Sequence, residues 1–215
     1  MLKDYNNAVD YYDKALDAKT IDADYAMYQK AVVLGLLDKD EQKAKVLEQM
    51  LASYSASEYA AAAKYELGKT YLGLNQLDKS LTYFNKVIKE HPNTPYFIPN
   101  SMLQVGNIQN KKKNYDAAFT TLNEVVNKYP KTEIAMEAVE ILREICKNKG
   151  DNDCLDKLKG LSPNLSIAQL DSDNYEIAIN YFFDDKFTDA GKSFQKYIQK
   201  FPDGTFITEA YYYKA

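Results

Sequence analysis

Few residues of this chain have side chains suited to catalysis or metal binding. Its 215 residues include one histidine and two cysteines. His91 lies in the segment Glu90-His91-Pro92, at the expected end of a helix, where a cationic side chain interacts favourably with the helix dipole. No nucleophile is tied to it, so this role outweighs that of a general base. Since one histidine leaves almost nothing for a zinc site or a thiol–imidazole pair, we expect no enzymatic activity.

Other ligand-binding motifs are incomplete. The segment Asp171–Glu176 begins like a calcium-binding loop, but the sixth position requires glycine and holds Glu176. We interpret it as the acidic start of a helix. Asn164-Leu165-Ser166 matches the glycosylation triplet, a pattern with many false positives, and no phosphate-binding glycine-rich loop is present. We therefore expect no cofactor and no metal.

Cys146 and Cys154 lie at the end of one expected helix and the start of the next. Antiparallel helix ends can bring such positions within disulfide reach, which requires Cα atoms no more than about 7 Å apart. Two interpretations stay open. The pair forms a local disulfide, which suits an oxidising compartment, or both are buried thiols and Cys154 fills a position for a small residue.

The composition excludes further classes of protein. The formal net charge is −4, and the one tight basic cluster is Lys111–Lys113, so a nucleic-acid partner has little support. The longest strongly apolar stretch, Ala31–Leu37, is far shorter than the ~20 residues that span a bilayer. We therefore expect no membrane-spanning segment. The low counts of glycine and proline, 8 and 6, favour a helical protein over one rich in sheet.

A repeat sets the organisation of the chain. Gly68, Ser80 and Pro92 recur as Gly106, Ala118 and Pro130. Extending this pattern predicts six small residues at intervals of 36, 36, 38, 36 and 36 positions: Ala8, Ala44, Ser80, Ala118, Cys154 and Ala190. Such a period is typical of repeat arrays.

Each unit has the pattern of two helices. Apolar residues at helical spacing predict helices over Tyr59–Leu74 and Asp78–Lys89, and Ser55 with Glu58 predicts a capping box before the first. Gly68 and Ser80 are expected where the two helices cross, because small residues let the backbones approach. A proline ends the second helix in three units, at Pro92, Pro130 and Pro202.

These residues resemble the tetratricopeptide repeat, whose pattern runs Leu-Gly-x-x-Tyr, Ala-x-x-x-Phe and Pro. Leu67–Tyr71, Ser80–Phe84 and Pro92 match it apart from the absent tryptophan and Ser80 in place of Ala. The resemblance implies an all-α fold, a right-handed superhelical solenoid of antiparallel helix pairs.

We expect one continuous array over residues 1–215, with a distorted joint at 161–173. Its predicted parts are a second helix at 1–20, helix pairs at 21–56, 57–92, 93–130, 131–166 and 167–202, and a first helix at 203–215. Neither end has the polar cap that usually closes an array, so we expect a fragment of a larger protein.

The period of 36 and the segment Lys128-Tyr129-Pro130 are similar to an envelope-associated bacterial branch of the family. That branch includes the Tol–Pal-associated YbgF type and the outer-membrane-assembly lipoprotein BamD. The similarity implies a periplasmic or outer-membrane-associated location and leaves a cytoplasmic one open.

In this family, the first helices line a concave groove that binds an extended or helical peptide. The register carries groove positions onto Gln29, Val33, Leu37, Tyr65, Lys69, Asn107, Asn110, Lys111, Val139, Arg143, Tyr175, Ile179 and Phe183. Lys69, Lys111 and Arg143 would favour an acidic partner. The alternative is an ordinary solvated helix face. The Lys-x-x-x-Asn pair of chaperone-tail clamps is missing, since Tyr65 precedes Lys69 and Leu103 precedes Asn107.

The sequence therefore predicts a non-catalytic scaffold that binds a protein or peptide partner, in bacterial envelope assembly or transport. The alternative is a structural spacer that self-associates through its open ends, which Tyr211-Tyr212-Tyr213 would favour.

Overall fold

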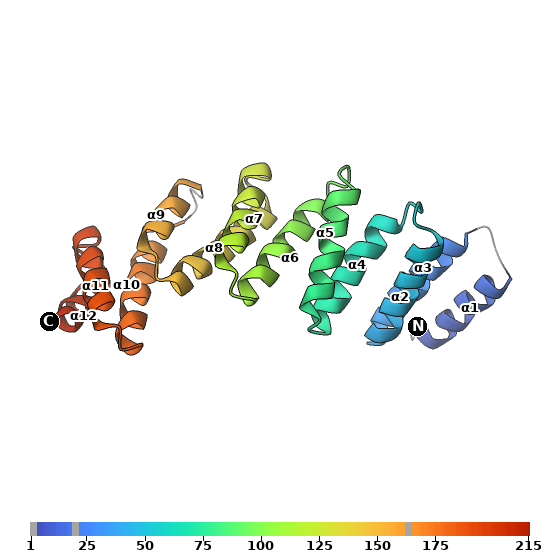
Figure 1. Ribbon diagram of the computed structural model, residues 1–215, viewed down its shortest axis with the longest axis horizontal. Coiled ribbons are helices and arrows are strands. Elements are labelled where there is room, and N and C mark those ends of the chain that lie inside the picture. The colour runs from blue at the N-terminus through green and yellow to red at the C-terminus, as the bar shows by residue number, and fades with distance from the viewer. Residues whose placement is uncertain (1–3, 19–21, 162–164) are drawn as a thin grey trace. The chain divides into compact units, whose positions relative to one another are not determined.

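A computed structural model describes residues 4–18, 22–161 and 165–215 of the chain. In these residues the structure consists of helices, with no strand, which confirms the all-α prediction (Figure 1). The helices are α1 (Tyr5–Asp17), α2 (Ala23–Leu36), α3 (Asp40–Ser53), α4 (Ala60–Gly73), α5 (Leu77–Glu90), α6 (Phe97–Lys111), α7 (Tyr115–Lys128), α8 (Glu133–Lys149), α9 (Asn152–Leu161), α10 (Ile167–Phe183), α11 (Phe187–Lys200) and α12 (Ile207–Lys214).

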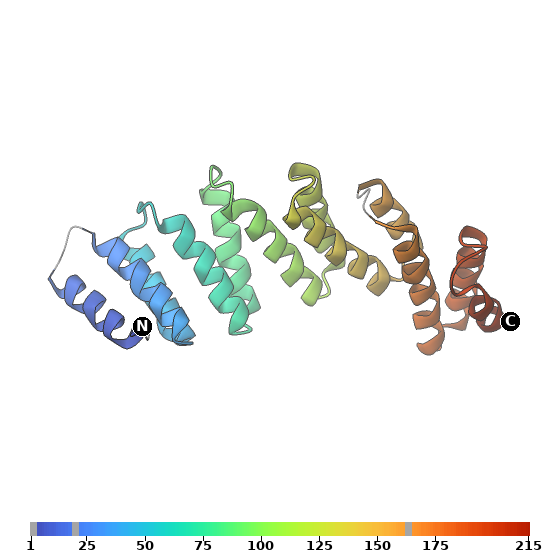
Figure 2. The ribbon, with the colours of Figure 1, turned by 180° about the vertical axis from the view of Figure 1, so that it is seen from behind.

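The helices pack into two compact units, Met1–Val105 and Gly106–Ala215, with the division inside α6. Consecutive helices contact one another from α1 to α5 in the first unit and from α7 to α12 in the second, and they follow in chain order, as Figures 1 and 2 show from opposite sides. In the second unit, α8 also contacts α10, so first helices of successive pairs touch directly. This arrangement is a solenoid of helical repeats.

The turn between the two helices of a pair has the same geometry in five places. One residue takes the left-handed conformation, and the next N–H donates to a carbonyl five residues back, as Gln76 does to Tyr71 at 2.8 Å. This is the Schellman ending of a helix. The left-handed residues are Asp38, Asn75, Lys113, Gly150 and Asp185.

The helix starts differ from the predicted capping box. The predicted helix Tyr59–Leu74 is confirmed as α4, but it begins at Ala60, so Ser55 and Glu58 both precede it. Ser57 instead accepts from the N–H of Tyr59 at 3.1 Å. A complete capping box occurs at the start of α10, between Ser166 and Gln169.

Close approach of α4 and α5 depends on Gly68. Ser80 of α5 donates its hydroxyl to the Gly68 carbonyl at 2.7 Å, and a Cβ at position 68 would lie 2.7 Å from the Phe84 ring. Gly106 has the same role in the second unit, where its Cβ would lie 2.5 Å from Leu122. The predicted crossing at small residues is confirmed.

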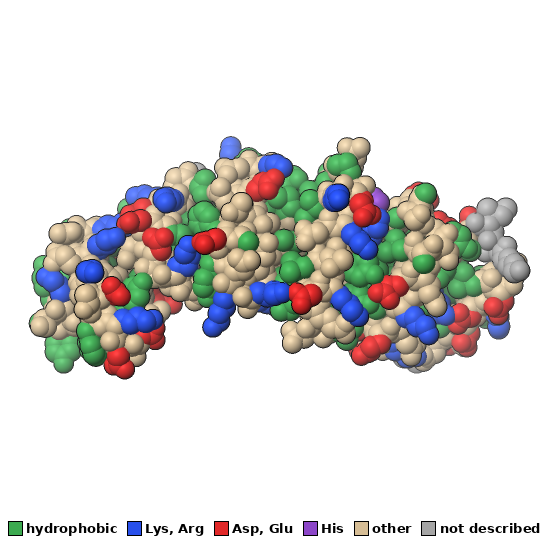
Figure 3. Space-filling model, in the orientation of Figure 1, with side chains coloured by type: hydrophobic (Ala, Val, Ile, Leu, Met, Phe, Trp, Pro, Cys, Tyr) green, Lys and Arg blue, Asp and Glu red, His purple; other side chains and the backbone are tan. Residues whose placement is uncertain are grey.

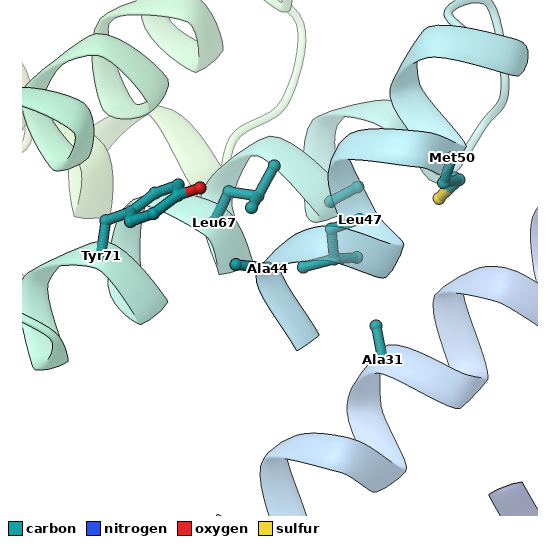
Figure 4. Packing of buried hydrophobic residues seen from close by; sticks show 7 residues of the cluster. Ala31, Ala44, Leu47, Met50, Leu67 and Tyr71 are labelled. Atoms are coloured by element: carbon teal, nitrogen blue, oxygen red, sulfur yellow. The ribbon is translucent and has the colours of Figure 1, made fainter. Parts of the chain in front are cut away.

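The core of the first unit is shared between neighbouring pairs. Ala31 of α2, Leu47 and Met50 of α3, and Leu67 and Tyr71 of α4 form one buried cluster (Figure 4). Because α3 packs against both α2 and α4, each pair is completed by the next one.

Two further expectations concern particular segments. The predicted joint at 161–173 lies partly outside the described residues, since these omit 162–164; α9 ends at Leu161 and α10 begins at Ile167. Among the residues that the structure describes, every helix is too short or too polar to cross a membrane.

Gly68→Ala should destabilise the protein. Overpacking against Phe84 costs ~1–3 kcal/mol, and alanine returns at most ~1 kcal/mol of helix propensity. We expect the free energy of unfolding in urea to fall by about 1 kcal/mol, the middle of the difference between these two effects. Gly191→Ala in α11 is the matched control, because its Cβ would meet nothing within 4 Å. That variant should gain about 0.5–1 kcal/mol. Equal stability of the two variants would contradict the close crossing.

Candidate functional site

The predicted groove residues of the first unit have different environments. Gln29 and Val33 on α2 and Leu37 after it are half-buried. Tyr65 is 8% exposed and packs against the rings of Phe84 and Phe97, so it is a packing residue.

Lys69 is exposed, but its charge has partners within the chain. Its Nζ lies 3.0 Å from a carboxylate oxygen of Glu66 and 5.7 Å from the centre of the Tyr65 ring. On the face seen in Figure 3, basic and acidic side chains are interspersed in both units. The basic residues therefore do not form a separate surface on that face.

The predicted residues on α6 and α8 are also mixed. Asn107 is half-buried and Lys111 is exposed, while Val139 is buried. Asn110 is buried, and its side-chain oxygen has no hydrogen-bond partner among the described residues.

Arg143 forms a bidentate ion pair with Asp173 of α10. Its Nε and Nη2 donate to the two carboxylate oxygens at 2.8 and 3.1 Å, and the Asp173 side chain is 4% exposed. The hydrogen bonds to Asp173 raise the pKa of the guanidinium. This cation therefore joins α8 to α10.

The acidic segment Asp171–Glu176 lies inside α10, so its interpretation as a helix start is wrong. Ser166 caps the helix five residues earlier. Asp171 is buried and accepts the Tyr197 hydroxyl and the Thr205 N–H, the latter at 2.8 Å. The Asp171 carboxylate is therefore an internal hydrogen-bond acceptor that holds α11 and the turn that follows it.

The remaining predicted residues lie along α10. Tyr175 stacks on Phe206 with ring centres 4.5 Å apart, and Ile179 is half-buried. Phe183, at the end of the helix, is 71% exposed. Exposure to solvent therefore increases along α10, from Tyr175 and Ile179 to Phe183.

A hollow of about 500 Å³ lies where α8, α10 and the start of α11 meet. Its lining residues are Lys147, Asn148, Lys149, Gly150, Ile177, Asn180, Tyr181, Phe183, Asp184, Lys186 and Asp189. We call it the α8–α10 pocket. Phe183 is the predicted groove residue that lines it. The other lining residues were missed, although the spacing of Val139 and Arg143 leads four positions on to Lys147.

The three lysines of the α8–α10 pocket are paired within the chain. Lys147 contacts Glu176 at 2.9 Å, Lys149 contacts Asp116 at 2.7 Å and Lys186 contacts Asp184 at 2.9 Å. In contrast, the exposed side-chain amides of Asn148 and Asn180 form no hydrogen bond with any described residue. The pocket therefore offers neutral donors and acceptors beside an exposed ring.

One wall of the pocket is the turn between α8 and α9. Gly150 is left-handed, with a φ of 66°, and its carbonyl accepts the Tyr181 hydroxyl at 3.2 Å. A Cβ at this position would lie 1.9 Å from the Tyr181 oxygen, so only glycine fits. The structure joins Cys146 and Cys154 in a disulfide across the same turn, with Cα atoms 5.5 Å apart.

His91 has a partner that the sequence did not indicate. Nζ of the buried Lys64 lies 2.8 Å from its Nε2 and 2.7 Å from Glu90. Burial, followed by the Lys64 ammonium, lowers the pKa of His91. His91 lies at the end of α5 as expected, but its lowered pKa disfavours the cationic form there. No group of three potential metal ligands occurs in the described part of the chain.

Arg143→Ala should destabilise the protein far more than Lys69→Ala. The first change leaves the Asp173 carboxylate buried, with Lys147 at 3.8 Å too distant for a hydrogen bond. We expect a loss of about 3–5 kcal/mol in the free energy of unfolding. Lys69→Ala, the matched control, removes an exposed pair and should cost ~0.5 kcal/mol or less. Similar losses in urea denaturation would show that Arg143 is not a structural ion-pair residue.

Comparison with known proteins bears on the fold. The tetratricopeptide repeat family model matches residues 62–94, 100–132 and 174–204. The chain matches none of the curated proteins with which it was compared. A tetratricopeptide repeat protein from Parabacteroides merdae ATCC 43184 is similar, with a TM-score of 0.60 and 10% identity over 89% of this chain and 70% of that one.

Another similar structure is YrrB, described as a TPR protein with an unusual peptide-binding site. It has a TM-score of 0.57 and 17% identity, covering 93% of this chain and 96% of that one. At such identities the likeness concerns the fold. The family model therefore matches three segments of the chain, and the fold is an all-α solenoid of helical repeats, as in these similar structures.

Proposed function

We propose that this chain is a non-catalytic scaffold that binds a protein or peptide partner, and that the α8–α10 pocket is a contact site. The observation that carries the proposal is one hollow that combines the exposed Phe183 ring with the exposed amides of Asn148 and Asn180, which bond to no described side chain or backbone group. Tetratricopeptide repeats are in general interaction modules.

The chemistry of the pocket suits a peptide. A carboxamide has a carbonyl acceptor and an NH₂ donor, so Asn148 and Asn180 match the C=O and N–H groups of a peptide backbone. Phe183, which is 71% exposed, offers apolar surface to one side chain of the ligand. Because Lys147, Lys149 and Lys186 already have carboxylate partners, we propose that apolar contacts contribute more than charge.

The rest of the predicted groove remains part of the proposal. Lys69 and Lys111 are exposed, and Gln29, Val33 and Leu37 are half-buried, so these side chains are accessible on the first helices. Peptide binding by YrrB supports the idea only at the level of the shared fold.

We also propose a role in the bacterial envelope, in assembly or transport. Two features support it: the resemblance of the 36-residue repeats to the YbgF and BamD branch, and the pairing of Cys146 with Cys154. Disulfides persist in oxidising compartments such as the periplasm.

Peptide binding should depend on Phe183. A phage-displayed library of random 12-residue peptides is selected on the immobilised protein, and the affinity of enriched peptides is measured by fluorescence anisotropy. Loss of a packed phenyl ring removes about 1.5–3 kcal/mol of apolar burial, so Phe183→Ser should raise Kd by about 10-fold or more.

The matched control is Phe187→Ser, which removes another exposed phenyl ring outside the pocket and should change Kd less than about 2-fold. Asn180→Leu, which keeps the volume but removes the amide, should also weaken binding. The proposal fails if no peptide is enriched, or if the Phe183 and Phe187 variants bind alike.

The alternative function is a self-associating spacer, which one observation favours. On α12, Tyr211 and Tyr212 are 59% and 77% exposed, and exposed aromatic side chains often mark protein interfaces. If this reading holds, sedimentation velocity should show a sedimentation coefficient that rises with protein concentration, and Tyr212→Ser should reduce that rise. A strict monomer at all concentrations would rule it out.

A further inference from the structure

We propose that the Cys146–Cys154 disulfide is a redox control of the α8–α10 pocket. With the bridge intact, the turn between α8 and α9 is held as a wall of the pocket. Reduction releases this turn and weakens ligand binding. The inference rests on the proposed function, because it concerns regulation of the same site.

The bridge encloses the wall of the pocket. Four consecutive lining residues, Lys147–Gly150, lie between the two cysteines in sequence, which are eight positions apart. Lys147–Lys149 form the last turn of α8 and Gly150 follows them, so the position of the Gly150 carbonyl depends on how firmly the bridge closes this end of the helix. A covalent closure restricts the loop in the unfolded and the locally opened states alike.

The helix beyond the bridge has little other support. α9 has 10 residues, whereas the equivalent second helices α3, α5, α7 and α11 each have 14. A helix this short is marginal without tertiary contacts. Its apolar anchors are Leu155 and Leu158, together with Cys154 itself. The bridge therefore holds the shortest second helix among these five.

Among the described residues, α9 has two buried side-chain hydrogen bonds and two surface ion pairs to other helices. Asn152 donates to Asn174 and accepts from Ser193, both at 2.9 Å, inside the protein. The pairs from Asp153 to Lys196 and from Asp156 to Lys200 are at the surface, where ion pairs contribute little. Loss of the bridge leaves the two bonds of Asn152 as the main polar attachment.

Opening of the turn reaches the pocket through one direct contact. The Gly150 carbonyl accepts the Tyr181 hydroxyl, and both residues line the pocket. When the turn moves away, Tyr181 loses this acceptor and the pocket loses the part of its wall that Gly150 forms. The exposed Phe183 ring stays on α10, so the apolar contact survives while this part of the wall is lost.

The chemical step is thiol–disulfide exchange with a dithiol reductant. One thiolate of the reductant attacks Sγ of Cys154, the S–S bond breaks and Cys146 leaves as a thiolate. The second thiolate of the reductant then displaces Cys154 and closes the reductant's own disulfide. Two electrons pass to the protein, and each released thiolate takes up one proton.

Pocket occupancy and reduction are coupled in both directions. Cys146 is fully buried and Cys154 is 5% exposed, so attack requires the turn to open. A ligand that contacts this wall disfavours opening of the turn and so slows reduction of the disulfide. By the same linkage, reduction lowers the affinity for the ligand.

The first test needs no ligand. Hydrogen exchange is followed by mass spectrometry in the oxidised protein and after dithiothreitol treatment. Closing a loop of this length predicts roughly 30- to 100-fold faster exchange of amides 147–161 after reduction. Exchange in α4 of the first unit should not change. Two free thiols in denatured, unreduced protein, or equal exchange in both states, would overturn the inference.

The double variant Cys146→Ala/Cys154→Ala is the control for the reductant. It should show the fast exchange without treatment and no further change with dithiothreitol. If the variant exchanges like the oxidised wild type, the bridge does not hold the wall. Unchanged exchange of α4 in the first unit and of α7 in the second shows that both units of the variant are folded.

The second test uses the peptide selected by phage display on the oxidised protein. Its Kd should rise about 10-fold or more on reduction, and its presence should slow the appearance of free thiols. If exchange changes but no peptide is ever selected, the proposed function fails and the redox control of the wall stands. If the peptide binds equally in both states, the redox control fails and the proposed function stands.

Discussion

The reversal between paired helices is the constraint on which the rest of this structure depends. Five turns place one residue in the left-handed conformation and close the same hydrogen bond across it. This ending sets the direction in which the second helix leaves, and so makes the two helices of a pair antiparallel. The crossing at Gly68 and Ser80 follows from it, because a turn this short brings the backbones together.

The second unit adds a polar network to this apolar scheme. Asp171, Asp173 and Asn174 are all buried on one helix, and each has a hydrogen-bond partner on another element or on its own helix. Buried polar groups are costly unless they are satisfied, so such a network favours one arrangement of α8, α10 and α11 over slipped alternatives. Burial, together with the bond to Asp171, raises the pKa of Tyr197, which keeps this hydroxyl a donor.

The same network explains the character of the candidate site. Arg143 and Lys147 point their charges at carboxylates of α10, which leaves the amides of Asn148 and Asn180 as the polar groups available in the pocket. The pocket has several lysines in its sequence, but their pairing with carboxylates leaves its surface close to neutral. Gly150 has two roles: it takes the left-handed conformation that closes the turn, and its lack of a Cβ leaves space for the Tyr181 hydroxyl.

Sequence and tertiary structure decided different things about this protein. The 36-residue spacing of small residues, with helical periodicity between them, predicted the all-α fold, the helices Tyr59–Leu74 and Asp78–Lys89 and the crossing at Gly68. These features depend on residues within one helix pair, and local periodicity is visible in a single sequence.

The tertiary structure alone decided which side chains meet across pairs. Arg143 and Asp173 are 30 positions apart, and Lys64 and His91 are 27 apart. Their pairing depends on the angle and offset between helices. No short sequence pattern predicts these two quantities. The register therefore placed Tyr65 and Arg143 on a binding surface, whereas packing assigned one to the core and the other to an ion pair.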